Sequence, residues 1–315
     1  MTVRRVWRAF ALGVGWAGVV IATLLVLSFL GSLFWVLDLA ANFRPQASVV
    51  LVFLGIVAVA GRARVPGWTT LAVGLIGLVS LVPHLLDAPP PIADGSPTIR
   101  IMSFNVGISN PNRTAVAEFI AHEDPDVVFI FESSFEWEDT IRGAGLPLQI
   151  VLVVPRGRLA GVTVLARPEL RPGRLDVELG GEVAAVEVDL GDERVAVLGI
   201  HPVSPTSPSR ASARDGLIAR AADWVATRAG DVVVVGDLNA TPWSHAYSTL
   251  RLRGGLVDTL RGKGLQPTWP QGWGALMIPI DHVLHTRGLG SSDRHTGPAF
   301  GSAHRPVLVE IGVAG

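Results

Sequence analysis

The chain has 315 residues, with 26 lysines and arginines against 27 aspartates and glutamates, and its formal net charge is −1. It contains no cysteine, which excludes disulfides and thiolate metal sites. Residues 98–315 hold 20 basic and 24 acidic residues without a basic run, which disfavours duplex binding through lysine and arginine but leaves an acidic nuclease open.

The first part of the chain contains three uncharged apolar runs. They cover residues 9–37, 45–61 and 67–86. About 20 helical residues cross a hydrocarbon core of ~30 Å, so residues 1–86 are predicted to form a membrane anchor of three transmembrane helices. A cleaved signal peptide is the alternative for the first run, but its apolar region would normally be only ~7–15 residues long.

The placement of arginine predicts the orientation of this anchor. Five arginines precede the first run or lie between the second and third, and they are Arg4, Arg5, Arg8, Arg62 and Arg64. Only Arg44 lies between the first and second runs. Because basic loops stay in the cytoplasm, three crossings put everything after residue 86 outside the cell. The second run is at the short limit, and the compartment reverses if it does not cross.

Residues 87–97, DAPPPIADGSP, predict a stiff, Pro-rich linker that extends by about 3 Å per residue. Residues 98–315 then read as a single α/β domain. Asn112 is expected to cap its first helix, and Ser133 with Glu136 matches a capping box for the second. Expected strands cover 100–106, 126–132, 148–154, 162–166, 183–190, 194–200, 231–235, 278–284 and 306–311, and expected helices cover 112–123, 133–142, 210–228 and 244–252. Apolar strands with intervening helices predict two stacked sheets with helices outside.

Polar side chains stand at six expected strand ends. They are Asn105, Glu132, His201, Asp237 with Asn239, Asp281, and His304. Taken singly, each has an ordinary structural interpretation, since Asp237 can cap a strand, Glu132 a helix, and Asp281 a turn. His122, His245, His285 and His295 are expected to be structural or surface residues. Together, carboxylates, amides and imidazoles at strand ends that open into loops predict a site for phosphate or metal chemistry.

These residues lie in motifs that resemble the endonuclease/exonuclease/phosphatase superfamily. The motifs are SFN (103–105), the strand-terminal Glu132, GIHPVSP (199–205), GDLNAT (236–241), IDHV (280–283) and SAHRPV (302–307). The resemblance covers about residues 98–312. It implies a four-layered α/β/β/α sandwich and metal-dependent cleavage of a phosphoester or phosphoanhydride.

Each polar residue receives an expected role in that chemistry. Glu132, with Asn105 beside it, would hold Mg²⁺ or Mn²⁺ through oxygen. Asp281 would fix the tautomer of His304, and Asp237 would orient or deprotonate the attacking water. Asn239 and His201 would donate to the nonbridging oxygens. Whether Asp237 or His304 is the base stays open.

The chain departs from the superfamily pattern in two places. Ala303 stands where the superfamily usually has an aspartate immediately before the final histidine. The resemblance implies that this aspartate contributes to the metal site, so its replacement bears on metal affinity or on a second metal position. Tyr247 is the chain's only tyrosine, so the frequent active-site tyrosine has no obvious counterpart. The first departure leaves a catalytically degenerate, phosphate-binding module as an alternative to an enzyme.

The membrane anchor favours a phosphorylated lipid as the substrate, because a tethered site meets a membrane-embedded molecule at high effective concentration. Trp269 and Trp273, on a Pro/Gly-rich loop before Asp281, are expected to contact the bilayer interface or to pack on the sandwich. The anchor and outward domain also resemble the actinobacterial membrane proteins linked to teicoplanin resistance, which implies a cell-envelope role on undecaprenyl-linked phosphates. A cell-surface nuclease is a less favoured alternative, and no protein partner is inferred.

Overall fold

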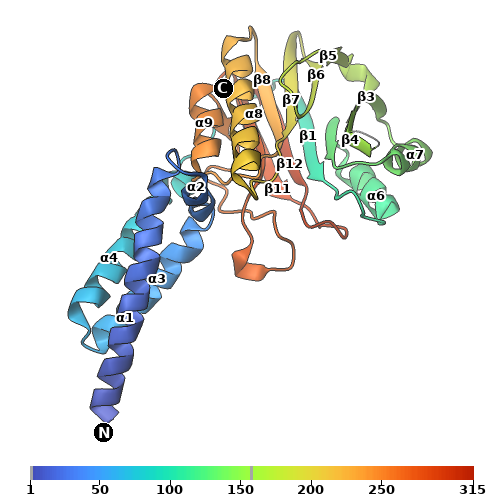
Figure 1. Ribbon diagram of the computed structural model, residues 1–315. Helices are drawn as coiled ribbons and strands as arrows, with labels where there is room; N and C mark the ends of the chain where they lie inside the picture. The colour runs from blue at the N-terminus through green and yellow to red at the C-terminus, as the bar shows by residue number, and fades with distance from the viewer. Residues whose placement is uncertain (1–2, 157–158) are drawn as a thin grey trace. The chain divides into compact units, whose positions relative to one another are not determined.

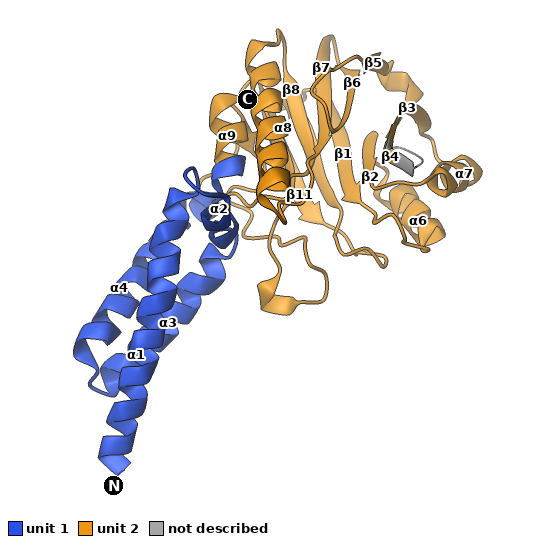
Figure 2. Cartoon of the chain, in the orientation of Figure 1, with its two compact units in different colours: residues 1–86, 243–246 blue, residues 87–242, 247–315 orange. Residues whose placement is uncertain are grey.

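The computed structural model describes residues 3–156 and 159–315. The chain forms two compact units, one of residues 1–86 with 243–246 and the other of residues 87–242 with 247–315 (Figure 2).

The first unit is helical. Its elements are α1 (Val3–Leu27), η1 (Ser28–Leu30), α2 (Trp35–Ala41), α3 (Arg44–Ala60), α4 (Arg64–Val79) and α5 (Val82–Leu86). The segments Val3–Leu30 and Arg64–Leu86 are each long and apolar enough to cross a membrane. The helices α2 and α3 pass the same test only as a pair, and they are bent by 69° to each other. The unit therefore offers two spans, or three if the bent pair is one span.

The expected first span over residues 9–37 extends too far at its end. The helical segment ends at Leu30, and α2 starts afresh at Trp35 after a turn. Apolar composition alone does not detect this break, because the residues of the turn are themselves uncharged.

Small residues let the helices of this unit approach closely. Thr70 of α4 donates from its hydroxyl to the carbonyl of Gly15 in α1 at 3.2 Å. Ala11, Ala58 and Ala63 form one buried cluster between α1, α3 and the start of α4. In a membrane, lipid tails are as apolar as the helix surfaces, so the hydrophobic effect does not drive helices together. Close packing of small residues and hydrogen bonds between helices hold them together instead.

The second unit contains two six-stranded sheets within the described residues (Figure 1). The first has the order β11-β12-β1-β2-β4-β3, with β1 (Thr98–Asn105), β2 (Val127–Phe131), β3 (Gln149–Arg156), β4 (Leu159–Ala166), β11 (Leu289–Thr296) and β12 (Val307–Val313). The second has the order β5-β6-β7-β8-β10-β9, with β5 (Gly173–Leu175), β6 (Glu182–Leu190), β7 (Glu193–His201), β8 (Val232–Asp237), β9 (Val257–Asp258) and β10 (Asp281–His285).

The strands are buried on both faces, which explains their nearly continuous apolar sequences. Ile101 and Phe129 point into the core between the sheets, together with Val197 and Val235 of the second sheet. On the outer face of the first sheet, α6 (Arg113–Glu123) and α7 (Phe135–Gly143) cover a separate apolar cluster. The outer face of the second sheet carries α8 (Pro208–Thr227) and α9 (His245–Arg253) (Figure 1). The predicted four-layered sandwich is confirmed.

The segment expected to be a linker packs on the second unit instead of standing free. Ala93 donates its backbone N–H to Val313 at 2.9 Å, and Ser291 donates to Pro90 at 3.1 Å. Ile92 and Ala314 form an isolated β-bridge. Backbone groups of residues 87–97 are thus paired with β11, with β12 or with the residue after β12. A Pro-rich composition does not predict this long-range pairing.

Two local expectations are also corrected. The side chain of Asn112 does not cap α6 but donates to the carbonyl of Phe300 at 3.0 Å. The residue preceding α7 is Ser134 and not Ser133, and Ser133 instead shares a hydrogen bond of 2.9 Å with Thr163 on β4. Strand β11 was not expected, because its sequence LGSSDRHT is largely polar.

Candidate active site

Sheet topology brings the predicted polar residues to one edge of the sandwich. In the first sheet, β1 and β2 run parallel and end at Asn105 and Phe131, directly before Glu132. In the second, β7 and β8 run parallel and end at His201 and Asp237. Because β10 is antiparallel to β8, its first residue Asp281 lies directly opposite Asp237.

The backbone at these strand ends is unusual. Glu132 and Asn239 have φ of 53° and 49°, in the left-handed region that few residues other than glycine adopt. Gly236 has φ of 145°, and a Cβ atom there would overlap the carbonyl oxygen of Ile200 on β7. The chain therefore turns sharply where the strands end, and glycine is required for β8 to lie against β7.

Asn105 holds two carboxylates of the site together. Its Nδ2 donates to Oε1 of Glu132 at 3.2 Å and to Oδ2 of Asp237 at 3.1 Å. Its Oδ1 accepts from the backbone N–H of Gly107 at 3.1 Å, which fixes the orientation of the amide. The nitrogen of the Asn105 amide thus faces the two carboxylates, and the role of Asn105 beside a metal stays a prediction.

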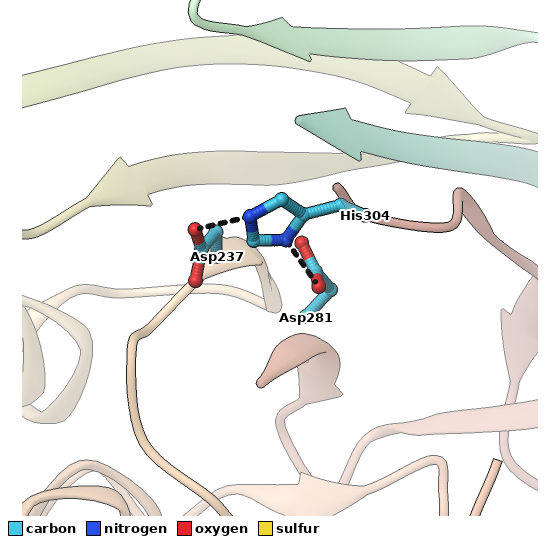
Figure 3. A group of neighbouring side chains, drawn as sticks. All are labelled: Asp237, Asp281 and His304. Atoms are coloured by element: carbon cyan, nitrogen blue, oxygen red, sulfur yellow. Dashed lines mark hydrogen bonds and ion pairs between the residues drawn. The ribbon is translucent and has the colours of Figure 1, made fainter. Parts of the chain in front are cut away.

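His304 lies between two aspartates (Figure 3). Its Nδ1 donates to Oδ2 of Asp281 at 3.0 Å, and its Nε2 lies 3.7 Å from Oδ2 of Asp237. Thr268 supports Asp281, because its hydroxyl accepts the backbone N–H of Ile280 and of Asp281, each at 3.2 Å. The expected hydrogen bond between Asp281 and His304 is thus present, and it directs Nε2 toward the centre of the site.

Glu182 is a residue of the site that the sequence analysis did not identify. Its Oε2 lies 2.8 Å from Nδ1 of His201, whose Nε2 lies 3.5 Å from Asp237 and 3.7 Å from Glu132. Glu182 is the first residue of β6 and stands opposite His201 in the β6–β7 hairpin. The pairing depends on a two-residue turn at Gly191 and Asp192, whereas the expected strands left three residues between them and so did not fix the register.

Asn239 joins two loops of the site. Its backbone N–H donates to Oδ1 of Asp237 at 3.0 Å, and its Nδ2 donates to the carbonyl of Pro202 at 3.1 Å. Its Oδ1 accepts from the hydroxyl of Ser204 at 3.1 Å. One amide hydrogen of Asn239 is left for a substrate oxygen, since the amide group carries two.

Two buried residues support this loop from behind, and neither was expected. Arg214 of α8 is fully buried and donates from Nη1 to the carbonyl of Asn239 at 3.1 Å. His282 is also fully buried, and its Nε2 lies 2.8 Å from the carbonyl oxygen of Ala240. Together they fix the backbone on which the side chain of Asn239 is carried.

The imidazoles of the site are strongly perturbed. Burial alone lowers the pKa of His201, but hydrogen bonds to Asp237 and Glu182 and the charges of these carboxylates outweigh it and raise the pKa to about 10. Burial likewise opposes the charge of His304, while Asp281 and Asp237 raise its pKa to about 9. For Asp237, burial raises the pKa, but the charges of His304 and His201 prevail and lower it well below its usual value.

The site fits a divalent cation. Glu132, Glu182, Asp237 and Asp281 with two imidazolium ions carry a formal charge of −2, which a divalent cation would neutralise. Oδ1 of Asp281 is buried and has no hydrogen-bond partner among the described residues. Carboxylate oxygens of Asp237 and Asp281 lie within 4.8 Å of each other, beside the imidazolium of His304. Glu132 is the most exposed of these carboxylates, and its role as an oxygen ligand of Mg²⁺ or Mn²⁺ stays a prediction.

The remaining predicted residues lie at the border of the site or away from it. The ring of Trp269 lies 6.4 Å from that of His304, while Trp273 is 64% exposed on the same loop. Ala303 is exposed, and its carbonyl accepts from the backbone of Gln271 at 2.8 Å. Tyr247 is buried against His282, so it takes no place at the strand ends.

Two stacked sheets between helices, with carboxylates, amides and imidazoles converging at one edge, define the fold and site of a class of phosphoester hydrolases. A sequence model of the endonuclease/exonuclease/phosphatase family matches residues 102–304, and the chain belongs to this family. Members of the family are generally divalent-metal-dependent hydrolases of phosphoester bonds.

Solved structures share the fold. An endonuclease/exonuclease/phosphatase from Beutenbergia cavernae is 20% identical, with a TM-score of 0.54 over 70% of this chain and 72% of that one. A humanized D. rerio TDP2 is 14% identical, with a TM-score of 0.58 over 69% and 99%. A family protein from Bacteroides vulgatus is 18% identical, with a TM-score of 0.56 over 69% and 99%. No curated protein matches the chain.

Proposed function

We propose that this chain is a membrane-anchored, divalent-metal-dependent phosphoesterase whose catalytic unit lies outside the cytoplasm and acts on a lipid-linked phosphate or pyrophosphate. The observation that carries the catalytic part is the meeting of Asn105, Glu132, His201, Asp237 and His304 at one edge of the sandwich. Three of these residues end the strands β1, β7 and β8, Glu132 directly follows β2, and His304 lies in the loop before β12. Residues that only capped their own strands would not need to converge in this way.

The charge states of the site support one assignment of the proton transfers. A divalent cation at Glu132 would polarise a phosphoryl oxygen and offset the charge that develops there. Asp237, whose pKa is lowered, is ionised at neutral pH and accepts a proton from the attacking water. His304 and His201, whose pKa values are raised, are protonated and donate to the phosphate oxygens. Asn239 contributes its remaining amide hydrogen to the same oxygens.

A lipid-linked substrate is supported by three features outside the reacting groups. The first unit provides helices long enough to cross a membrane, and the excess of arginine around them favours an outward catalytic unit. On the second unit, the loop that leads to Asp281 exposes Trp273 and Leu276. Exposed tryptophan is typical of surfaces that meet the headgroup region of a bilayer. A cavity of about 420 Å³ beside His201 and Glu182 gives room for substrate groups beyond the phosphate.

The test is a substrate and metal panel on the full chain in detergent and in vesicles. Bis-p-nitrophenyl phosphate, isoprenyl pyrophosphate, phosphatidyl lipids and plasmid DNA are compared with Mg²⁺, with Mn²⁺ and with EDTA, and Asp237→Asn serves as the inactive control. Metal-dependent release of phosphate from isoprenyl pyrophosphate supports the proposal. Nicking of plasmid without lipid turnover establishes a nuclease instead, and tight phosphate binding without turnover establishes a binding module.

The loop surface is tested by Trp273→Ala. The variant is expected to lower activity on lipid substrate in vesicles and to leave hydrolysis of the soluble ester unchanged. Phe135→Ala is the matched control, because Phe135 is 54% exposed on α7. Equal losses on both substrates would show that Trp273 supports the site itself and not contact with the membrane.

A further inference from the structure

A pocket lined by four arginines lies at one end of the helical unit. It has a volume of about 830 Å³ and is bordered by Arg5 and Arg8 of α1, Arg62 of the α3–α4 turn, and Arg64 of α4. The two groups of arginines are more than fifty positions apart in the sequence. Folding therefore gathers into one place the residues whose charge sets the predicted orientation of the anchor.

The framework that carries these arginines is tightly packed. A Cβ atom at Gly61 would overlap the side chain of Ala11, so the α3–α4 turn lies directly against α1. Arg62 follows with φ of 68°, which turns the chain into α4. The guanidinium groups therefore extend from a fixed backbone, and a ligand meets them with little ordering of the main chain.

The charge of this pocket is not balanced within the unit. Residues 1–86 contain six arginines and one acidic residue, Asp38. None of the four pocket arginines has a carboxylate partner among the residues that the structure describes. Guanidinium groups match the geometry of phosphate oxygens and bind them through paired hydrogen bonds. The pocket is thus suited to a phosphate-bearing anion.

The pocket has apolar walls as well as charged ones. Leu12 and Val65 line it and are 46% and 76% exposed. They continue into the exposed apolar surfaces of α1 and α4, the two segments long enough to cross a membrane. A free phosphate ion would leave the apolar side chains of the pocket in water. A phospholipid would place its headgroup against the arginines and the start of its acyl chains against the apolar side chains.

We propose that this pocket binds the headgroup of an anionic phospholipid in the leaflet that surrounds this end of the helices. The inference rests on the proposed membrane location but not on the proposed hydrolysis. Binding there would fix the orientation of the helices by a specific contact in addition to the general attraction of arginine to the cytoplasmic leaflet.

The experiment is native mass spectrometry of the full chain in detergent, titrated with cardiolipin, phosphatidylglycerol or phosphatidylcholine. We expect the anionic lipids to bind in preference to phosphatidylcholine. A basic residue contributes about fivefold to the binding of an anionic membrane, so Arg62→Gln with Arg64→Gln should weaken cardiolipin binding about thirtyfold. The matched control is Arg4→Gln, which removes a charge from the same end of α1 but does not line the pocket, and it should keep affinity within about twofold.

A second pair, Arg5→Gln with Arg8→Gln, provides the same test if the first does not fold, as judged by thermal melting. Equal losses in Arg4→Gln and the pocket variants, or equal binding of phosphatidylcholine, would overturn the proposal. Competition by millimolar inorganic phosphate as strong as by lipid would overturn the lipid assignment. Hydrolysis is measured separately on the soluble ester, so a failed lipid site and an inactive catalytic site are told apart.

Discussion

Replacing Glu182 by glutamine tests the electrostatics of the site. In the structure, Glu182 lies 2.8 Å from Nδ1 of His201 and helps to raise its pKa to about 10. An opposite charge close to an imidazole changes its pKa by about 1–3 units. Since Asp237 stays 3.5 Å from Nε2, part of the upward shift survives. Glu182→Gln should therefore lower the pKa of His201 to about 7–9.

The assay is an NMR titration of histidine ring carbons in the full chain in detergent, with EDTA present, between pH 5 and 11. His304 is the internal control, because its partner is Asp281 at 3.0 Å and not Glu182. Its pKa of about 9 should change little in Glu182→Gln, and should fall in Asp281→Asn while that of His201 holds. An unchanged pKa of His201, or equal changes at both histidines, would refute the pairing inferred here.

The remaining predictions concern turnover, metal affinity and stability. Asn239→Ala should lower turnover by about 10²–10³-fold, the usual loss of a donor to developing negative charge, and steady-state rates on a soluble phosphodiester check this. Ala303→Asp should lower the Mg²⁺ concentration at half-maximal rate, because it adds a carboxylate next to His304; an unchanged or higher value would count against a metal near this position. Gly236→Ala should destabilise the protein by about 2–4 kcal/mol, measured as a lower denaturation midpoint, since its Cβ would overlap Ile200. Folding raises the pKa of His201 from 6.5 to about 10, so its stabilisation is complete below pH 6.5 and lost as the pH rises through about 10; a midpoint in EDTA that does not fall between pH 7 and 10 would contradict this.

Much of the site was predictable because its residues end apolar strands. Asp237 and His201 follow runs of valine, leucine and isoleucine, and the carboxyl ends of neighbouring parallel strands meet at one edge. The family motifs added the grouping of Asp281 and His304, which the hydrogen bond between them confirms. Local sequence was sufficient wherever a strand end fixed the position of a side chain.

The misses have long-range causes. Glu182 enters the site through hairpin register, and Arg214 through the packing of α8 on a distant loop. In the sequence, Glu182 looks like any exposed charged residue of a strand, and Arg214 looks like any exposed charged residue of a helix. The orientation of the Asn105 amide depends on the backbone of Gly107, which residue identity does not reveal. A search for uncharged runs does not find the break after the first membrane segment, because the residues of its turn are uncharged like those of the helix.

The direct pairing of Asp237 with Asp281 separates the reacting groups from the chain between them. Apart from Asn239 and Thr268, which contact the two aspartates, residues 238–280 leave β8 and return in β10 with α9 and both loop tryptophans on the way. As long as β8 and β10 keep their register, this connecting segment can become longer or shorter, or change its surface residues, without moving either aspartate. Selection can thus rebuild what the enzyme recognises while the atoms that carry out the reaction stay in place.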